Sequence, residues 1–400
     1  MENRKSNKKE IITLYGILSF MLFCMYARFA AFQLADNNLG VLFLSYKNGF
    51  VSAGLLGTVW RVLNQITSVE LMTYESVYYA AKWMMILYDV LVVILLTLIY
   101  RKSYRNKRQA LYLITLSLIV FGGMFCSSVT MGSYDMYEVM VLLLILILLF
   151  SQRVQGAIVA LVLLGMLIHP SFLFKCFPLV AVMLFYQYKK TGKKSYQSYL
   201  ILSAAVAVVV FVASEISVWG VQTQQEEALA FGQLLSANPQ NYDAALAGRT
   251  LRECSAILPE WGYRGNNYIN LVIFLLMFSP YWMLGQSFCE HFYRQKMTED
   301  QAKVYRLMQW GTLAIIPQLL LKITYGYFVA EVMIYYLILL MFYIAQEDEL
   351  VLTQMARSGE QLKNRMPVAY VLLLYPLLFM PFTDVSILSG FDFIARIFGA

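Results

Sequence analysis

The chain has 400 residues, of which 60% are hydrophobic and only 14% are charged, and its formal net charge is +7. Soluble domains usually carry about a quarter charged residues. Here the charges fall in short clusters between long apolar runs, as a bilayer demands, because a spanning helix needs about 20 largely apolar residues. Strands of a membrane barrel would alternate polar and apolar side chains, and runs such as 139–150 do not. The sequence therefore predicts an all-α polytopic integral membrane protein.

About eleven transmembrane helices are expected between the charged clusters. The expected spans are 11–33, 80–100, 109–127, 138–151, 154–168, 174–188, 199–219, 267–287, 307–323, 327–345 and 367–383. Most of the 31 basic residues cluster in alternate turns, which the positive-inside rule assigns to the cytoplasm. This pattern predicts a cytoplasmic N-terminus and a C-terminus on the outer side. It also favours membrane orientation over nucleic-acid binding as the reason for the basic charge.

Two outward-facing segments are too long and too polar to be simple turns, and the rest of 1–400 is expected to be a single membrane domain. The first segment, 34–79, has apolar residues at helical spacing between 55 and 66, opposite polar ones. This spacing predicts an amphipathic helix that lies in the plane of the membrane interface. The second segment, 220–266, contains several glutamates and arginines and is expected to be largely helical.

Four side chains at the outer ends of the spans could perform acid–base chemistry. Asp36 follows the first span and is either a general base for a sugar hydroxyl or a solvated helix end. Asp135 and Glu138 lie at the start of the fourth span on one helix face. They either take part in acid–base chemistry or interact favourably with the positive end of the helix dipole. His169, followed by proline and serine, closes the fifth span and either donates to a substrate hydroxyl or phosphate or caps backbone carbonyls.

Few basic residues are expected on the outer side. Arginine holds phosphate through two parallel hydrogen bonds, so a group of such residues would suit a lipid-linked diphosphate. The alternatives are ion pairs with Glu253 and Glu260 or contacts with anionic lipid head groups. The candidate phosphate-binding residues are Arg28, Lys47, Arg61, Arg249, Arg252 and Arg264. No second histidine or cysteine cluster accompanies His169, so no metal site and no cofactor are expected, and a divalent cation is not indicated.

Asp89, midway along the second expected span, is the one clear intramembrane carboxylate in the sequence. An ionisable group at that depth is a functional hypothesis, for example as part of a proton relay. A transporter normally has several such groups together with broken helices in paired halves. The sequence therefore gives only a weak indication of transport.

Three short stretches resemble bacterial multi-pass proteins of surface-polysaccharide assembly. Residues 46–59 resemble a motif that reads N-G-F-V-x-R-G-L-x-G-T, in which Ala53 replaces the arginine. Residues 167–172, followed by Pro178, are similar to the I-H-x-S…P run of EpsG- and Wzy-type polysaccharide polymerases. The acidic residue after the first span and the amphipathic helix over 54–66 resemble the layout of type C glycosyltransferases.

The resemblance implies a hexosyltransferase-like enzyme or a repeat-unit polymerase. Its substrates would be polyprenyl-phosphate-linked sugars on the outer face of the bacterial cytoplasmic membrane, with membrane lipid and other polysaccharide-assembly proteins as partners. Asp36, with Asp135 as the competing candidate, would deprotonate the acceptor hydroxyl. Lys47, Arg61 and the arginines of 220–266 would hold the leaving (di)phosphate, and His169 would position a sugar. Two other hypotheses stay open, namely a flippase or exporter of lipid-linked sugars and a non-catalytic component of an envelope complex.

Overall fold

The computed structural model describes residues 40–42, 44–51, 53–67, 70–103, 132–151, 155–216, 282–283, 285–316 and 325–364. All regular structure within these residues is helical, which confirms the all-α part of the expected fold class. The elements are η1 (Gly40–Leu42), η2 (Tyr46–Asn48), α3 (Leu55–Ile66), α4 (Tyr74–Ser103), α6 (Tyr134–Ser151), α7 (Ala157–Ile168), α8 (Phe172–Lys175), α9 (Phe177–Thr191), α10 (Lys194–Ile216), α14 (Glu299–Leu313), α15 (Tyr325–Ala345) and α16 (Glu349–Asn364). Residues 285–293 are helical as well.

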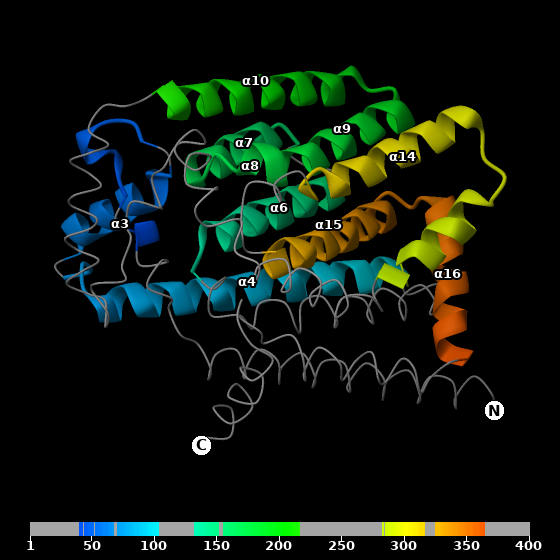
Figure 1. Cartoon of the computed structure of the whole chain (residues 1–400), viewed down its shortest axis with the longest axis horizontal. Coiled ribbons are helices and arrows are strands. Elements are labelled where there is room, and N and C mark those ends of the chain that lie inside the picture. The colour runs from blue at the N-terminus through cyan, green and yellow to red at the C-terminus, as the bar shows by residue number, and fades with distance from the viewer. Residues whose placement is uncertain are drawn as a thin grey trace, which may run out of the picture.

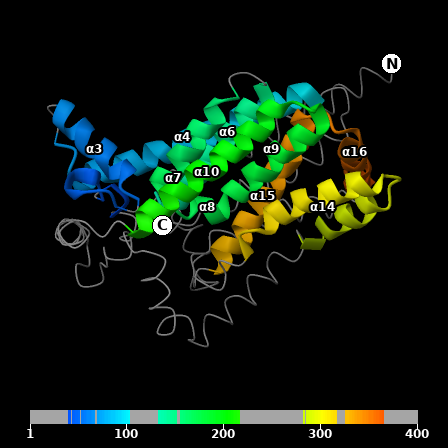
Figure 2. The ribbon, with the colours of Figure 1, turned by 90° about the horizontal axis from the view of Figure 1, so that it is seen from above.

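The long helices lie side by side along the longest axis of the molecule (Figure 1). Helix α10 packs against α7 and α9, α6 packs against α7, α4 and α15, and α14 packs against α9 and α15. Helix α3 lies at one end of this bundle and α16 crosses the other end, as both views show (Figures 1 and 2). The two ends of the bundle are therefore covered by different helices.

Three described helical segments are long and apolar enough to cross a membrane, namely Tyr74–Ile99, Tyr134–Ser151 and Lys194–Ile216. Helix α6 is apolar on all sides and mostly buried, as expected for a helix surrounded by others. Helix α10 instead exposes large apolar side chains such as Ile201 and Val209. An exposed face of this kind suits contact with lipid. These features are consistent with a membrane protein.

Several expected elements are found at the expected positions. Helices occupy the segments 80–100, 138–151, 174–188 and 327–345, and α10 covers the described part of 199–219. The amphipathic helix expected over 55–66 is α3. The expected spans 11–33, 109–127 and 367–383, the outer segment 220–266 and most of 267–287 lie outside the described residues.

Three helices differ from the sequence prediction. Helix α7 has only 12 residues, and α14 begins at Glu299, well before the expected 307. The early start of α14 follows from a capping box, in which Thr298 and Gln301 each bond to the other's backbone N–H. Helix α16 was not expected, because its charged residues indicate a turn; its buried residues, such as Val351 and Met355, recur at helical spacing.

The end of the bundle at α16 is held together by one buried carboxylate. The hydroxyl groups of Tyr186 and Tyr305 both donate to Asp348, and the other oxygen of Asp348 accepts from the Val351 N–H at 3.1 Å. Lys190, in a basic cluster predicted to be cytoplasmic, donates to the Gln346 carbonyl next to this site. These bonds join α9 and α14 to the turn between α15 and α16. The basic cluster at the end of α9 therefore lies at the end of the bundle opposite α3 (Figure 1).

Candidate functional site

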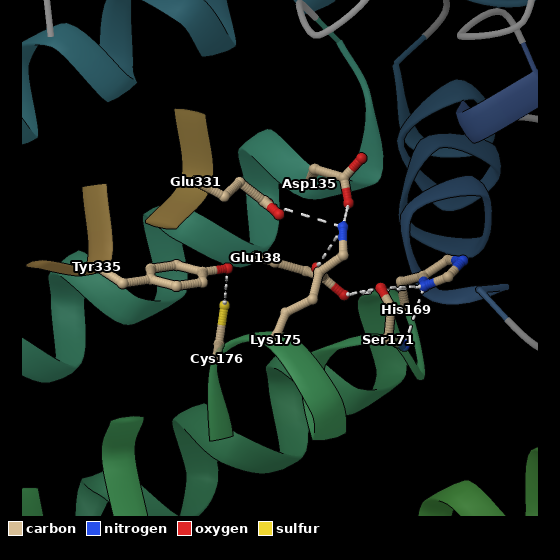
Figure 3. Close-up of polar contacts among 8 residues, drawn as sticks. All are labelled: Asp135, Glu138, His169, Ser171, Lys175, Cys176, Glu331 and Tyr335. Carbon is tan, nitrogen blue, oxygen red and sulfur yellow. Dashed lines mark hydrogen bonds and ion pairs between the residues drawn. The ribbon is translucent and has the colours of Figure 1, made fainter. Parts of the chain in front are cut away.

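A group of polar side chains gathers at the other end of the bundle, where α3 lies (Figure 3). We call it the polar cluster. It combines the first turn of α6, the turn that joins α7 to α8, and the first half of α15. Its members are Asp135, Glu138, His169, Ser171, Lys175 and Glu331.

The turn that carries His169 and Ser171, and the short helix α8 that carries Lys175, are set by their local sequence. His169 precedes a proline, which disfavours the helical conformation in the residue before it, and its φ of −160° and ψ of 134° are extended. Its N–H still closes the last turn of α7 by donating to the Gly165 carbonyl at 3.0 Å. The Ser171 carbonyl then accepts from the N–H of Lys175 at 2.9 Å, which starts α8. A Cβ atom on Gly165 would lie 2.6 Å from the Phe172 ring, so glycine lets the turn fold back closely.

Lys175 is the centre of the charged part of the cluster, and its side chain is completely buried. Its ammonium group pairs with Asp135 and lies 3.7 Å from Glu331 Oε1 and 3.9 Å from Glu138 Oε2. The two glutamate side chains are only 1% and 2% exposed. Buried carboxylates require a counter-ion because removing charge from water is costly. Lys175 is therefore the counter-ion that allows the carboxylates of α6 and α15 to be buried next to α8.

A second set of contacts leads from the buried charges toward the surface. Ser171 Oγ lies 2.7 Å from Glu138 Oε1 and 2.6 Å from His169 Nδ1. The His169 side chain is 24% exposed and packs against the Tyr134 ring, with 4.9 Å between the ring centroids. In Figure 3 the imidazole points away from Lys175, with the ring nitrogen Nδ1 turned toward Ser171. Glu138, Ser171 and His169 thus form a hydrogen-bonded chain from a buried carboxylate to an accessible imidazole.

The turn at His169 is recessed relative to its neighbouring helix. Phe174 of α8 packs edge-on against Phe211 of α10, with 5.3 Å between the ring centroids. Helix α10 continues from there to Ile216, which is about 7–8 Å further at 1.5 Å per residue. Helix α7, with 12 residues, rises only about 18 Å, whereas the apolar core of a bilayer is about 30 Å thick. Helix α7 is thus shorter than such a core is thick, and the polar cluster follows directly after its last residue.

The segment before α3 packs against the end of α7, next to the polar cluster. The Tyr46 hydroxyl donates to the Leu167 carbonyl at 3.2 Å, and the Tyr46 N–H donates to Thr58 Oγ1 at 2.8 Å. Burial raises the pKa of Tyr46 to about 12, so its hydroxyl keeps its proton at neutral pH. These bonds bring Lys47, which is exposed, and Arg61, which is partly buried, to the same end of the bundle as His169.

Ala53 occupies the position where the similar motif has arginine. Its side chain is buried, and its φ of 63° lies in the left-handed region. That conformation costs a non-glycine residue about 1–2 kcal/mol. Because the small side chain is buried in the segment before α3, the position supports the fold of that segment in this protein.

The structure brings together Asp135, Glu138 and His169, three of the four acid–base candidates, and places Lys47 and Arg61 at the same end. The remaining candidates lie outside the described residues: Arg28, Asp36, Arg249, Arg252 and Arg264.

The sequence analysis did not single out Ser171, Lys175 and Glu331 as site residues. A signal was present for Lys175, because a lysine within the apolar run 174–188 is unusual for a span.

The described residues contain no group of three His, Cys, Asp or Glu side chains arranged to hold a metal ion. Comparison with protein-family models, with curated proteins and with solved structures finds no match. The functional argument therefore depends on the chemistry of the polar cluster.

Proposed function

We propose that the chain is a membrane glycosyltransferase, or a repeat-unit polysaccharide polymerase, that acts on polyprenyl-phosphate-linked sugars at the outer face of the bacterial cytoplasmic membrane. The observation that carries the proposal is the polar cluster itself, which lies recessed at one end of an apolar bundle and beside the amphipathic α3. The bacterial membrane and its outer face come from the sequence resemblance and from the distribution of basic residues.

The depth of the cluster supports an amphiphilic substrate. A polyprenyl tail stays in the hydrocarbon while its phosphate and sugar stay at the boundary, which is the level of the polar turn. Helix α3 exposes Val59, Leu63 and Ile66 on one face, and these side chains suit the acyl boundary of the membrane. Lys47 and Arg61 lie on the segment that contains this helix. Their positive charges would hold the (di)phosphate through charge-assisted hydrogen bonds.

The reaction would be an inverting transfer. A base removes the proton of the acceptor hydroxyl, and the hydroxyl oxygen forms a bond to the anomeric carbon of the donor sugar. The bond between that carbon and the phosphate oxygen breaks, and its electron pair leaves with the lipid (di)phosphate. The cations would stabilise this leaving group as its charge develops. The candidates for the base are Asp36, Asp135, Glu138 and His169.

The proposal is tested by the lipid-linked sugars of a strain that lacks the gene. We expect short lipid-linked units to accumulate on the outer leaflet, and wild-type protein to remove them. Lys47→Ala and Arg61→Ala should restore glycan assembly poorly. Lys303→Ala, which alters an exposed ion pair with Glu299, should restore it fully. Unchanged lipid-linked sugars in the deletion strain would refute the proposal.

A second candidate function is proton-coupled movement of lipid-linked sugars across the membrane. It is favoured by the burial of Glu138, Lys175 and Glu331 together between helices, since the sequence alone indicates only Asp89. Buried ionisable groups that face one another are typical of proton relays in transporters. In the deletion strain this function predicts accumulation on the inner leaflet, whereas the transferase predicts accumulation on the outer leaflet.

A further inference from the structure

We infer that His169 is the proton acceptor of the site, and that Ser171 and Glu138 are positioning residues that keep its Nε2 atom able to accept. This inference rests on the proposed function for the identity of the substrate, namely a hydroxyl group of the acceptor sugar. The hydrogen-bond pattern that supports it is independent of the substrate.

The Ser171 hydroxyl has a single proton to donate. This hydroxyl lies within hydrogen-bonding distance of both Glu138 Oε1 and His169 Nδ1, so it donates to one and accepts from the other. When Glu138 is ionised it can only accept, so the hydroxyl donates to Glu138. Nδ1 must then carry a proton and donate it to Ser171 Oγ. In this arrangement a neutral imidazole has its acceptor lone pair on Nε2.

The opposite arrangement is also accommodated by the turn. The main-chain N–H of Ser171 donates to His169 Nδ1 at 3.1 Å, and only an Nδ1 without a proton can accept this bond. If Glu138 were protonated, it would donate to Ser171 Oγ, the hydroxyl would donate to Nδ1, and Nε2 would carry the proton. The charge of Glu138 therefore decides which ring nitrogen accepts, through the Ser171 hydroxyl and through the direct approach of Glu138 Oε1 to His169 Nδ1 at 3.8 Å.

Lys175 favours the ionised form of Glu138, while Asp135 and Glu331, the other carboxylates at this ammonium group, oppose a further negative charge on Glu138. The ammonium group of Lys175 lies 3.9 Å from its second oxygen, in a region with little exposed surface. Among the described residues, charged and titratable groups around Glu138, Ser171 and His169 include Asp135 and Tyr134 on α6, Lys175 on α8 and Glu331 on α15. Asp135 is paired with Lys175 and so is less suited to take a proton from a substrate. His169 is the member of the chain with an accessible side chain.

His169 receives the proton that the acceptor hydroxyl loses. Nε2 of His169 takes the proton of the acceptor hydroxyl as its oxygen bonds to the anomeric carbon and the (di)phosphate leaves with the electron pair. The resulting imidazolium keeps its Nδ1–H bond to Ser171, whose hydroxyl remains bonded to the Glu138 carboxylate. A carboxylate reached through a hydroxyl stabilises the positive ring in the same manner as a direct partner, though more weakly. After the product leaves, the imidazolium returns its proton to water.

The tautomer of His169 tests the inference without any substrate. The chain has only two histidines, so the full-length protein labelled with ¹⁵N-histidine gives two sets of ring signals, and His291→Gln identifies those of His169. We expect the Nδ1–H tautomer to be the major neutral form in the wild type. Ser171→Ala and Glu138→Gln should convert it to the Nε2–H form, whereas Ser171→Thr, which keeps the hydroxyl, should preserve it. A wild type with mainly the Nε2–H form, or variants with unchanged tautomer, would overturn the inference.

The catalytic part is tested by glycan assembly in cells. Loss of a general base typically slows a reaction by about 10²–10⁴-fold, so we expect His169→Gln to lose glycan synthesis to that extent. Ser171→Ala should lose it in part and Ser171→Thr should retain it. Normal glycan synthesis by His169→Gln would overturn the role of His169 and leave the proposed function standing. If the deletion strain has unchanged lipid-linked sugars, the proposed function fails while the tautomer result still decides the hydrogen-bond arrangement.

Discussion

Replacing Lys175 tests whether the charged half of the polar cluster forms as the structure describes it. Its ammonium group faces one paired aspartate and two glutamates at 3.7 and 3.9 Å. With an effective dielectric constant of 20, one pair at this distance is worth about 4 kcal/mol before desolvation is counted. Removing one partner of a buried pair typically costs about 3–5 kcal/mol, because the remaining charge has lost its counter-ion. We expect Lys175→Met to destabilise the protein by about this amount.

The assay is reversible unfolding of the full-length protein in mixed micelles by a titration with SDS. A double-mutant cycle with Asp135→Asn isolates the pairwise part, and residues in one ionic network usually couple by about 0.5–3 kcal/mol. Lys303→Met is the matched control, because its ion pair with Glu299 is exposed on both sides, and such pairs contribute about 0.3–0.5 kcal/mol. If Lys175→Met were as mild as Lys303→Met, or if its effect simply added to that of Asp135→Asn, the cluster would not form as described.

Three further predictions concern other parts of the chain. Gly57→Ala should destabilise the packing of α3 by about 1–3 kcal/mol, because a Cβ atom there meets backbone; Gly285→Ala, with open space around it, should be neutral or stabilising in the same SDS unfolding assay. Burial raises the pKa of the Cys289 thiol, and the thiolate is the reactive form. A variant that keeps only this cysteine should therefore react with maleimide more slowly when folded than in SDS. The reaction rate of the folded protein should still rise above pH 9. A spin label at Ile66, on the exposed apolar face of α3, should be more accessible to oxygen than one at Gln65, because we propose that this face contacts lipid; equal accessibility would contradict that placement.

The sequence was sufficient to predict several of the helices, because apolar runs and amphipathic spacing depend on local pattern. Helix α3 is found over the segment predicted from its spacing, and α6 occupies the expected apolar run. Asp135 and Glu138 were predicted to share a helix face, which is a consequence of their spacing alone. The ends of α14 were less predictable, since the capping box at Thr298 extends the helix into polar sequence.

The composition of the polar cluster could not be predicted in the same way. The contact between Glu138 and Ser171 joins residues 33 apart, and Lys175 reaches Glu331 from a different part of the chain. No periodic pattern relates these positions, because their distances depend on how α6, α8 and α15 pack. The burial of Lys175 is visible in the sequence only as a charge in an apolar run. Its three carboxylate partners become apparent only in the assembled bundle.

The two proposed functions assign different roles to Glu331. Stability alone does not account for the buried charges, because replacing a whole buried ion pair by apolar groups is often neutral or stabilising. In the transferase, the group that meets the substrate is His169 at the accessible end of the chain, and Glu331 serves only as one of three neighbours of Lys175. In a proton-coupled transporter, the proton must move deeper into the bundle, and Glu331 is the carboxylate furthest along that route. It lies one turn before Tyr335 and its contact with Cys176 (Figure 3).

We therefore expect Glu331→Gln to preserve the Nδ1–H tautomer of His169 and most glycan assembly, with donor lipid still on the outer leaflet. Glycan loss in Glu331→Gln with lipid-linked sugars trapped on the inner leaflet, while the protein remains folded, would reject the transferase in favour of the transporter.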